Sequence, residues 1–257
     1  MKSLISIVCF NLCLLILACQ PSSTSASQES LAEQTPTPEQ AEESNAVVDN
    51  TIAKELEAPI DYTINLPADL KMLSKAQGDL TKNGIDEQVF VVEPLVEEAE
   101  YMEAPPRRVQ VYRLAEGEWQ LWQEIPGGVL SADEGGMFGD PFQEVTIKRG
   151  ALVIEHYGGS RIRWHYTHRF RWQNEQWQLI GATIVYGAPC DYWHTYDYNL
   201  STDKVVAKWE VEDCDTEETT VDSFSFDHRI RPLPNMADFI PGETAVEVPE
   251  RDTEFYF

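Results

Sequence analysis

Three carboxylates lie in a glycine-rich stretch near the middle of the chain. Asp133 and Glu134 stand between the pairs Gly127-Gly128 and Gly135-Gly136, and Asp140 follows shortly after. Two carboxylates on loops of this kind can serve as acid and base in the hydrolysis of a glycosidic bond. Asp and Gly are also common turn formers, and this structural alternative is the one that we favour. We therefore assign no catalytic residue.

The loop after Gly78 carries oxygen ligands at the spacing of a calcium site. In such loops, oxygens at positions 1, 3, 5, 7 and 9 surround the ion, and a glycine at position 6 makes a sharp turn. The candidates are Asp79, Thr81, Asn83, the carbonyl of Ile85 and Glu87. Position 12 is Phe90, so the loop is not an EF-hand, and two carboxylates predict weak binding. The same residues could instead form a calcium-free Asn-Gly turn through their own hydrogen bonds.

Basic and aromatic residues alternate from Arg161 to Trp172. On a strand, the arginines would share one face and the aromatic rings the other. The aromatic face should pack in the core, and the basic face is a candidate contact surface for an anionic partner. The candidate binding residues are Ser160, Arg161, Arg163, Arg169 and Arg171. Pairing of these arginines with acidic residues on neighbouring strands is the favoured alternative.

His165 and His168 have the spacing of a His-x-x-His metal pair. On a strand, this odd spacing puts the two side chains on opposite faces, which argues against zinc ligation. We therefore expect His168 to be a packed, hydrogen-bonded residue of the core.

The N-terminal leader ends in Ile16-Leu17-Ala18-Cys19. Lys2 gives it a positive start, and the apolar run that follows is shorter than the roughly 20 residues that span a bilayer. The pattern resembles the lipobox of bacterial lipoproteins, in which the signal peptide is cut before the cysteine and the cysteine is acylated with chains such as palmitate. We expect Cys19 to anchor the protein outside the cytoplasm. If the cell has two membranes, Gln20 favours the outer one under the enterobacterial sorting rule.

The predicted leader also determines the expected state of the other cysteines. Cys9 and Cys13 leave with the leader, so Cys190 and Cys214 remain as an even pair in an oxidising compartment. A disulfide between them is the expected state, and it would close a loop of about 24 residues.

The segment 19–58 contains no aromatic residue and is rich in Ser, Thr, Gln, Pro and Glu. Such a composition cannot bury enough apolar surface to fold, so it predicts a disordered acidic tether. The whole chain has 44 acidic and 19 basic residues and a formal net charge of −25. A surface this acidic excludes nucleic acid as a partner.

Short β-like runs bounded by turn residues fill the rest of the chain, and no long helical periodicity competes with them. Hairpins are predicted at Glu116-Gly117, at Asn174-Glu175 and between Tyr198 and Lys204. The fold class is therefore mainly β, with antiparallel hairpins in a sandwich-like or open sheet. The predicted parts are a leader over 1–18, a tether over 19–58, a β-domain over 59–228 and an extended tail over 229–257 that packs on the domain.

Three motifs together resemble one group of proteins. They are the calcium-type loop at Gly78–Glu87, the run Gly135–Phe142 and the run His156–Trp164. The chain is similar to uncharacterised bacterial lipoproteins that carry a single FG-GAP or dockerin-like loop. This similarity covers most of residues 70 to 205, and it implies a secreted β-domain without implying an activity.

These features predict a lipid-anchored binding module of the cell envelope whose partner is an envelope protein or glycan. The expected contact surface is the Gly158–Arg163 turn, flanked by the Gly135–Phe142 loop. No Gly-x-Ser-x-Gly elbow, phosphate-binding loop or His-Glu-x-x-His motif is present in the sequence. A hydrolase that uses the loop carboxylates and a purely structural envelope protein are the alternatives. Calcium is the one cofactor that these features suggest.

Overall fold

The structure, a computed structural model, describes residues 64–96 and 103–257. The predicted leader, Cys19 and the predicted tether lie outside these residues. Within the described part, the chain forms thirteen strands and one 3-10 helix. In chain order these are β1 (Leu70–Gly78), β2 (Glu87–Pro94), β3 (Arg108–Ala115), β4 (Glu118–Ile125), β5 (Phe142–Lys148), β6 (Ala151–Gly159), β7 (Arg163–Gln173), β8 (Gln176–Ala188), β9 (Tyr192–Asn199), β10 (Lys204–Asp213), β11 (Glu218–Asp227), η1 (Met236–Asp238), β12 (Ala245–Val248) and β13 (Thr253–Tyr256).

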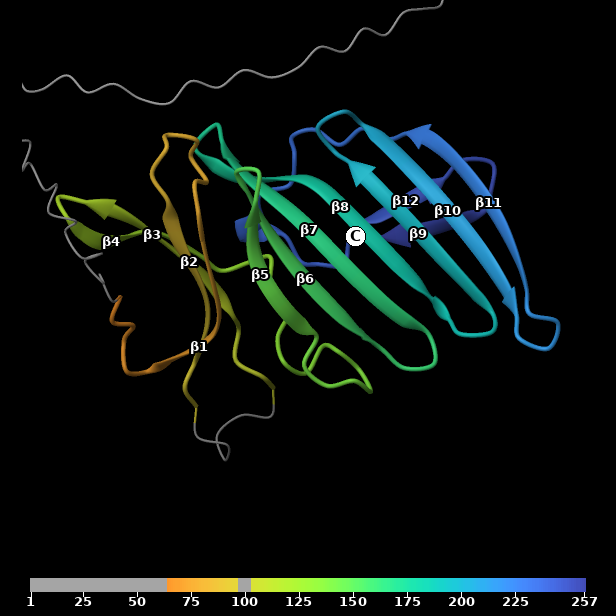
Figure 1. Ribbon diagram of the computed structural model, residues 1–257, viewed down its shortest axis with the longest axis horizontal. Helices are drawn as coiled ribbons and strands as arrows, with labels where there is room; N and C mark the ends of the chain where they lie inside the picture. Colours follow the sequence, from red (N-terminus) through yellow and green to blue (C-terminus); the bar gives the residue numbers. More distant parts are fainter. Residues whose placement is uncertain (1–63, 97–102) are drawn as a thin grey trace, which may run out of the picture. The chain divides into compact units, whose positions relative to one another are not determined.

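The strands form three antiparallel sheets in which neighbours in sequence are neighbours in space (Figure 1). One sheet has the order β1-β2-β3-β4, the second runs from β5 to β11 without a crossover, and the third is the β12–β13 hairpin. This arrangement confirms the predicted fold class. Short turns join every pair of neighbours in the seven-stranded sheet, because an antiparallel neighbour needs only a tight turn.

The predicted hairpins are present. Glu116 and Gly117 have φ angles of 55° and 83°, and Asn174 and Glu175 have φ angles of 52° and 60°. Two consecutive residues with positive φ are the mark of a type I′ turn, whose twist matches that of the flanking strands. The third predicted hairpin joins β9 to β10, where Asn199 pairs with Lys204.

Strand β7 begins at Arg163 and not at Arg161, which corrects the predicted span. Gly159 has a φ of +111°, and the amide of Ser160 donates a hydrogen bond to the carbonyl of Ile162 at 2.9 Å, so residues 160–162 form the turn before the strand. The predicted alternation holds from Arg163 onward. His168 and Phe170 are completely buried, whereas Arg169 lies on the opposite face.

One hydrophobic core serves the two larger sheets. Val89 and Val111 from the four-stranded sheet belong to the same buried cluster as Leu152 and Ile184 from the seven-stranded sheet. The sheets also approach each other where β1 contacts β5. The β5–β11 sheet therefore has an inner face in the core, and its other face is called the outer face below.

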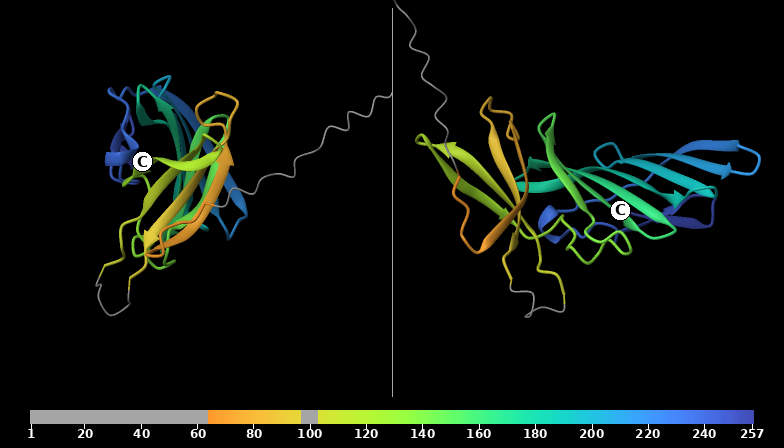
Figure 2. Two further views of the ribbon diagram at one scale, coloured as in Figure 1. Left: turned by 90° about the vertical axis from the view of Figure 1, so that its left-hand side faces the viewer. Right: turned by 60° about the horizontal axis from the view of Figure 1, so that its bottom comes forward.

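The C-terminal segment covers the inner face of the seven-stranded sheet (Figure 2). Phe255 stacks on Tyr196 with ring centroids 4.2 Å apart, and Phe257 meets the ring of Tyr198 edge-on at 5.5 Å. The aromatic residues at the end of the chain thus belong to the core. The segment 229–257 is only partly extended, because it contains η1 and the β12–β13 hairpin.

Candidate functional site

Two glycine-rich segments that lie far apart in the sequence meet beside the start of β7. The amide of Met137 donates to the carbonyl of Gly159 at 2.8 Å, and the amide of Gly159 donates to the carbonyl of Gly135 at 2.9 Å. We call the two segments, Gly135–Gly139 and Gly158–Arg163, the tip. The structure therefore joins the turn and the loop that the sequence named separately as a contact surface.

Glycine is required at the centre of the tip for steric reasons. A Cβ atom on Gly135 would lie 1.8 Å from the carbonyl oxygen of Gly139, and one on Gly159 would lie 2.2 Å from the carbonyl oxygen of Ile162. Contacts this short do not occur between real atoms, so a side chain at either position would distort the turn of its own segment. The glycines therefore fix the backbone of the tip.

The tip exposes large apolar side chains next to arginines. The exposed fraction is 84% for Met137, 46% for Phe138 and 45% for Ile162. The guanidinium of Arg163 lies 5.7 Å from the centre of the Phe138 ring, and Arg161 forms a solvent-exposed ion pair with Asp191 at 2.8 Å. Ser160 is exposed in the same turn. The tip thus combines an apolar patch with positive charge.

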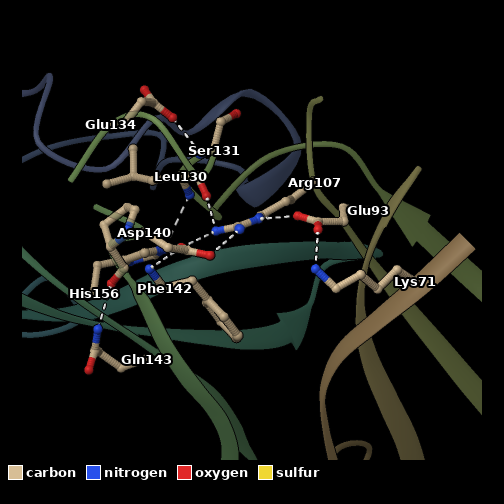
Figure 3. Close-up of polar contacts among 11 residues, drawn as sticks. Lys71, Glu93, Arg107, Leu130, Ser131, Glu134, Asp140, Phe142, Gln143 and His156 are labelled. Carbon is tan, nitrogen blue, oxygen red and sulfur yellow. Dashed lines mark hydrogen bonds and ion pairs between the residues drawn. The ribbon is translucent and has the colours of Figure 1, made fainter. Parts of the chain in front are cut away.

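A buried arginine anchors the loop that carries the tip (Figure 3). The side chain of Arg107 is only 1% exposed and donates two hydrogen bonds to Asp140, at 2.7 and 2.5 Å. It also donates to the carbonyl of Leu130 at 3.0 Å and to Glu93 at 3.1 Å, and Glu93 in turn pairs with Lys71. Such bidentate, charge-assisted bonds define position and orientation together.

The charge of Arg107 controls the ionisation of Asp140. Burial opposes the charged form, but the hydrogen bonds from Arg107 and from the amide of Phe142 outweigh it and lower the pKa of the Asp140 carboxyl. Asp140 is therefore an anchor that is ionised at neutral pH. A general acid of a glycosidase needs the opposite shift, a raised pKa.

The two other loop carboxylates also organise the backbone around them. Glu134 accepts a hydrogen bond from the amide of Ser131 at 2.5 Å, and Asp133 accepts one from the amide of Ala104 at 3.2 Å. All three carboxylates that could have supported hydrolysis thus form the contacts of turn and loop formers, which is the alternative that the sequence favoured.

Next to this network lies a buried neutral histidine. His156 is fully buried, and its Nε2 accepts a hydrogen bond from the amide of Leu130 at 3.2 Å. Burial, reinforced by the nearby charge of Arg107, lowers the pKa of His156 to about 3. The neutral ring therefore supports the same loop that Arg107 holds.

Sequence reasoning did not identify Arg107, although a signal was present. Arg107 shares its parity with Val109 and Val111, which are completely buried. Alternate residues of an extended chain point to one face, so this parity favours the side of Val109 and Val111 for Arg107, one residue before β3 begins. Its partners could not be named from the sequence because they lie 14 and 33 residues away.

The oxygens of the calcium-type loop are used within the loop. The carboxylate of Asp79 accepts hydrogen bonds from the amides of Asn83 and Gly84, at 3.1 and 2.9 Å. Glu87 is buried and accepts hydrogen bonds from the amide of Leu80 and the hydroxyl of Thr81. The amide of Ile85 donates to the side chain of Asn83, while the Ile85 side chain is exposed. These bonds form a closed turn, and calcium binding by the loop stays a prediction.

The basic face of β7 divides into two groups. Arg161 and Arg163 belong to the tip, whereas Arg169 and Arg171 line a concavity of the outer face together with Lys148 and Arg149. Arg169 donates to the neutral hydroxyl of Thr183 at 2.9 Å. Of the four predicted arginines, only Arg161 forms an ion pair within the described residues. Pairing with acidic residues on neighbouring strands therefore does not account for the whole set.

His165 and His168 lie on opposite faces of β7, as predicted. His165 is solvent-exposed near Glu155, while His168 packs among aromatic rings, with Phe239 at 4.9 Å. Burial lowers the pKa of His168 well below its usual range. Contrary to our expectation of a hydrogen-bonded histidine, neither ring nitrogen finds a partner in the described part of the chain. Over the same residues, no three His, Cys, Asp or Glu side chains cluster as metal ligands would.

The predicted disulfide is present. Cys190 and Cys214 are bonded, and the bond joins the turn after β8 to the residue that follows β10. The lipidation candidate Cys19 lies outside the described residues. Over residues 64–96 and 103–257, no helix has the length and apolar character needed to cross a bilayer.

Comparison of the chain with protein-family models and with curated protein sequences finds no match.

Proposed function

We propose that the protein is a lipid-anchored binding module of the cell envelope and that the tip is its contact surface. The observation that carries this proposal is the exposure of Met137, Phe138 and Ile162 on a backbone that glycine contacts and the Arg107 network hold in place. An apolar cluster of this kind on a folded domain is typical of an interaction site.

The composition of the tip favours a protein as the partner. Met, aromatic residues and Arg are the side chains that protein interfaces enrich, and the tip contains all three kinds. Glycan binding generally depends on several polar side chains around a concave site, and the tip projects apolar groups instead. A fixed backbone also reduces the entropy that is lost on binding.

The lipobox and the acidic tether complete this proposal. Acylated Cys19 would hold the chain at the membrane, and a flexible segment of about 39 residues has a typical end-to-end distance near 35 Å. The tip could then reach a partner away from the lipid surface. The strong negative charge of the chain would keep it from binding anionic headgroups without selectivity.

Photo-crosslinking in the native envelope tests the contact surface. A photoreactive residue in place of Ser160 should crosslink the anchored full-length chain to a protein. The double substitution Met137→Ser/Ile162→Ser should reduce the product about tenfold, because it removes the apolar contact and leaves the glycine backbone intact.

The control removes exposed apolar side chains elsewhere. Val206 and Val221 are 52% and 55% exposed on β10 and β11, and Val206→Ser/Val221→Ser should leave the crosslink unchanged. Equal loss in both variants, or in neither, would show that the tip is not the contact surface. If glycosidase degrades the crosslinked partner and protease does not, the partner is a glycan and not a protein. A Cys19→Ser chain that stays in the membrane fraction would disprove the lipid anchor.

A further inference from the structure

Four basic side chains converge on the outer face of the seven-stranded sheet. Lys148 and Arg149 come from the β5–β6 hairpin, and Arg169 and Arg171 come from β7. They line an open concavity of about 550 Å³, which we call the cationic pocket. It is separate from the tip, since the two share no residue.

The pocket has an apolar floor formed by Ala151, Val153, Ile180 and Gly181. Val153 alternates along β6 with the core residues Leu152 and Ile154, and it is 3% exposed. A register shift in β8 contributes to the floor. Arg169 pairs with Gly181 and Phe170 pairs with Leu179, which leaves Ile180 as the extra residue of a bulge.

Gly181 leaves the floor open. A Cβ atom at this position would have its nearest contacts at 3.6 Å, with Cδ of Arg169 and with the carbonyl oxygen of Tyr198. This is ordinary van der Waals distance, so the position tolerates a side chain, and a larger side chain would fill the hollow.

The positive charges of the pocket are poorly neutralised by the protein. Lys148 lies 3.9 Å from Glu155, while Arg149, Arg169 and Arg171 form no ion pair with any described residue. The Nε atom of Arg171 is buried and finds no hydrogen-bond acceptor in the same part of the chain. The one carboxylate that lines the pocket, Asp197, accepts a hydrogen bond from Thr183 at 3.0 Å.

This arrangement is unexpected in a chain with 44 acidic and 19 basic residues, where carboxylates are plentiful. Four like charges around one hollow repel one another unless an anion lies between them. Guanidinium groups match phosphate and carboxylate oxygens in geometry as well as in charge. We propose that the cationic pocket binds a small molecule that carries two or more phosphate or carboxylate groups.

Calorimetric titration of the full chain at low ionic strength, with pyrophosphate and with citrate as probes, tests this site. We expect saturable binding with one probe per chain, weakened by added salt. Arg171→Gln should reduce the affinity by about tenfold, because one charge-assisted hydrogen bond is worth roughly that factor. The control Lys75→Gln removes the same charge from an exposed position on β1 and should change the affinity less than about twofold.

A steric variant separates a built site from diffuse attraction. Gly181→Leu keeps every charge but fills the floor, so it should abolish binding, whereas Gly181→Ala should retain it. Near-ultraviolet circular dichroism of each variant establishes that the fold is intact. Arg169→Gln replaces Arg171→Gln if that variant fails this check, and Gly181→Val replaces Gly181→Leu. Absence of binding by both probes, equal loss in Lys75→Gln, or full binding by folded Gly181→Leu would overturn the proposal. Preference between pyrophosphate and citrate identifies the anionic group as phosphate or carboxylate.

Discussion

Arg107 connects parts of the chain that no local pattern brings together. Its guanidinium contacts Glu93 at the end of β2, the carbonyl of Leu130, and Asp140 before β5. A buried cation is costly without partners, and Arg107 satisfies its donors with two carboxylates and a carbonyl. This side chain holds the loop that carries the tip, together with the backbone hydrogen bonds that join the loop to the end of β6.

Replacing Arg107 should therefore destabilise the fold. Arg107→Ala leaves Glu93 and Asp140 without their cation and should lower the free energy of unfolding by about 3 kcal/mol. The neighbouring Arg108 forms an exposed pair with Glu124, and Arg108→Ala should cost less than about 1 kcal/mol. Urea denaturation of the two variants measures the difference. Equal losses would mean that the buried network contributes no more than a surface ion pair.

Because His156 and His168 are buried as neutral rings, we expect the fold to lose stability in acid. Burial keeps both rings neutral when folded, with the pKa of His156 at about 3, while the unfolded chain protonates them below pH 6.5. Unfolding therefore takes up protons, and stability falls as the pH decreases from about 6.5 towards 3. One such histidine contributes a slope of up to about 1.4 kcal/mol per pH unit.

The contribution of one ring can be removed by substitution. His168→Phe should flatten the dependence of the unfolding free energy on pH by about one proton, because the new ring does not titrate and suits its aromatic surroundings. Urea denaturation between pH 4 and pH 7 measures the slope. Tyr166→Phe, on the same face of β7, should keep the slope of the original protein. An unchanged slope in His168→Phe would contradict the assignment of a neutral buried histidine.

At the scale of elements, the strands follow from local sequence signals and the sheets follow from short turns. Each strand of the seven-stranded sheet pairs with its neighbours in sequence, so every register is set within one hairpin. The Cys190–Cys214 bond adds a constraint between two turns of this meander, the β8–β9 turn and the β10–β11 turn.

Removing this bond should make β9 and β10, the strands between the two cysteines, easier to unfold. The disulfide closes a sequence separation of 24 residues, and Cys190→Ala/Cys214→Ala should lower the unfolding free energy by roughly 3 kcal/mol. Thermal unfolding with and without a reducing agent measures the effect. The reductant should lower the melting temperature of the original protein and leave that of the double variant unchanged. A response in the double variant would assign the effect to something other than this bond.

For the described part of the molecule as a whole, the last residues of the chain complete the core. Phe255 and Phe257 are buried against the inner face, while Tyr256 between them is 43% exposed. The C-terminal segment therefore contributes to the core that both large sheets share.

The contribution of Phe255 to the core can be tested against its exposed neighbour Tyr256. Phe255→Ala should lower the unfolding free energy by about 3 kcal/mol or more through cavity formation, whereas Tyr256→Ala should cost much less. Chemical denaturation of both variants measures the contrast. Similar, small losses would show that the segment lies on the surface without supporting the core.

The sequence by itself determined the features that depend on neighbours along the chain. Alternation of residue types placed the aromatic and basic faces of β7, and turn residues located the hairpins at Glu116-Gly117 and Asn174-Glu175. Counting cysteines paired Cys190 with Cys214. These signals depend on residues close together in the chain or on the number of cysteines, so they can be interpreted without the packing of the side chains.

Only the tertiary structure decided which distant residues meet. It joined Gly135 to Gly159, gave Arg107 its partner Asp140, and divided the predicted basic stripe between the tip and a pocket shared with Lys148. Each of these contacts depends on how loops and hairpins pack once the registers are fixed. Long-range packing follows from the fit of many side chains in three dimensions, and a pattern along one strand carries no information about it.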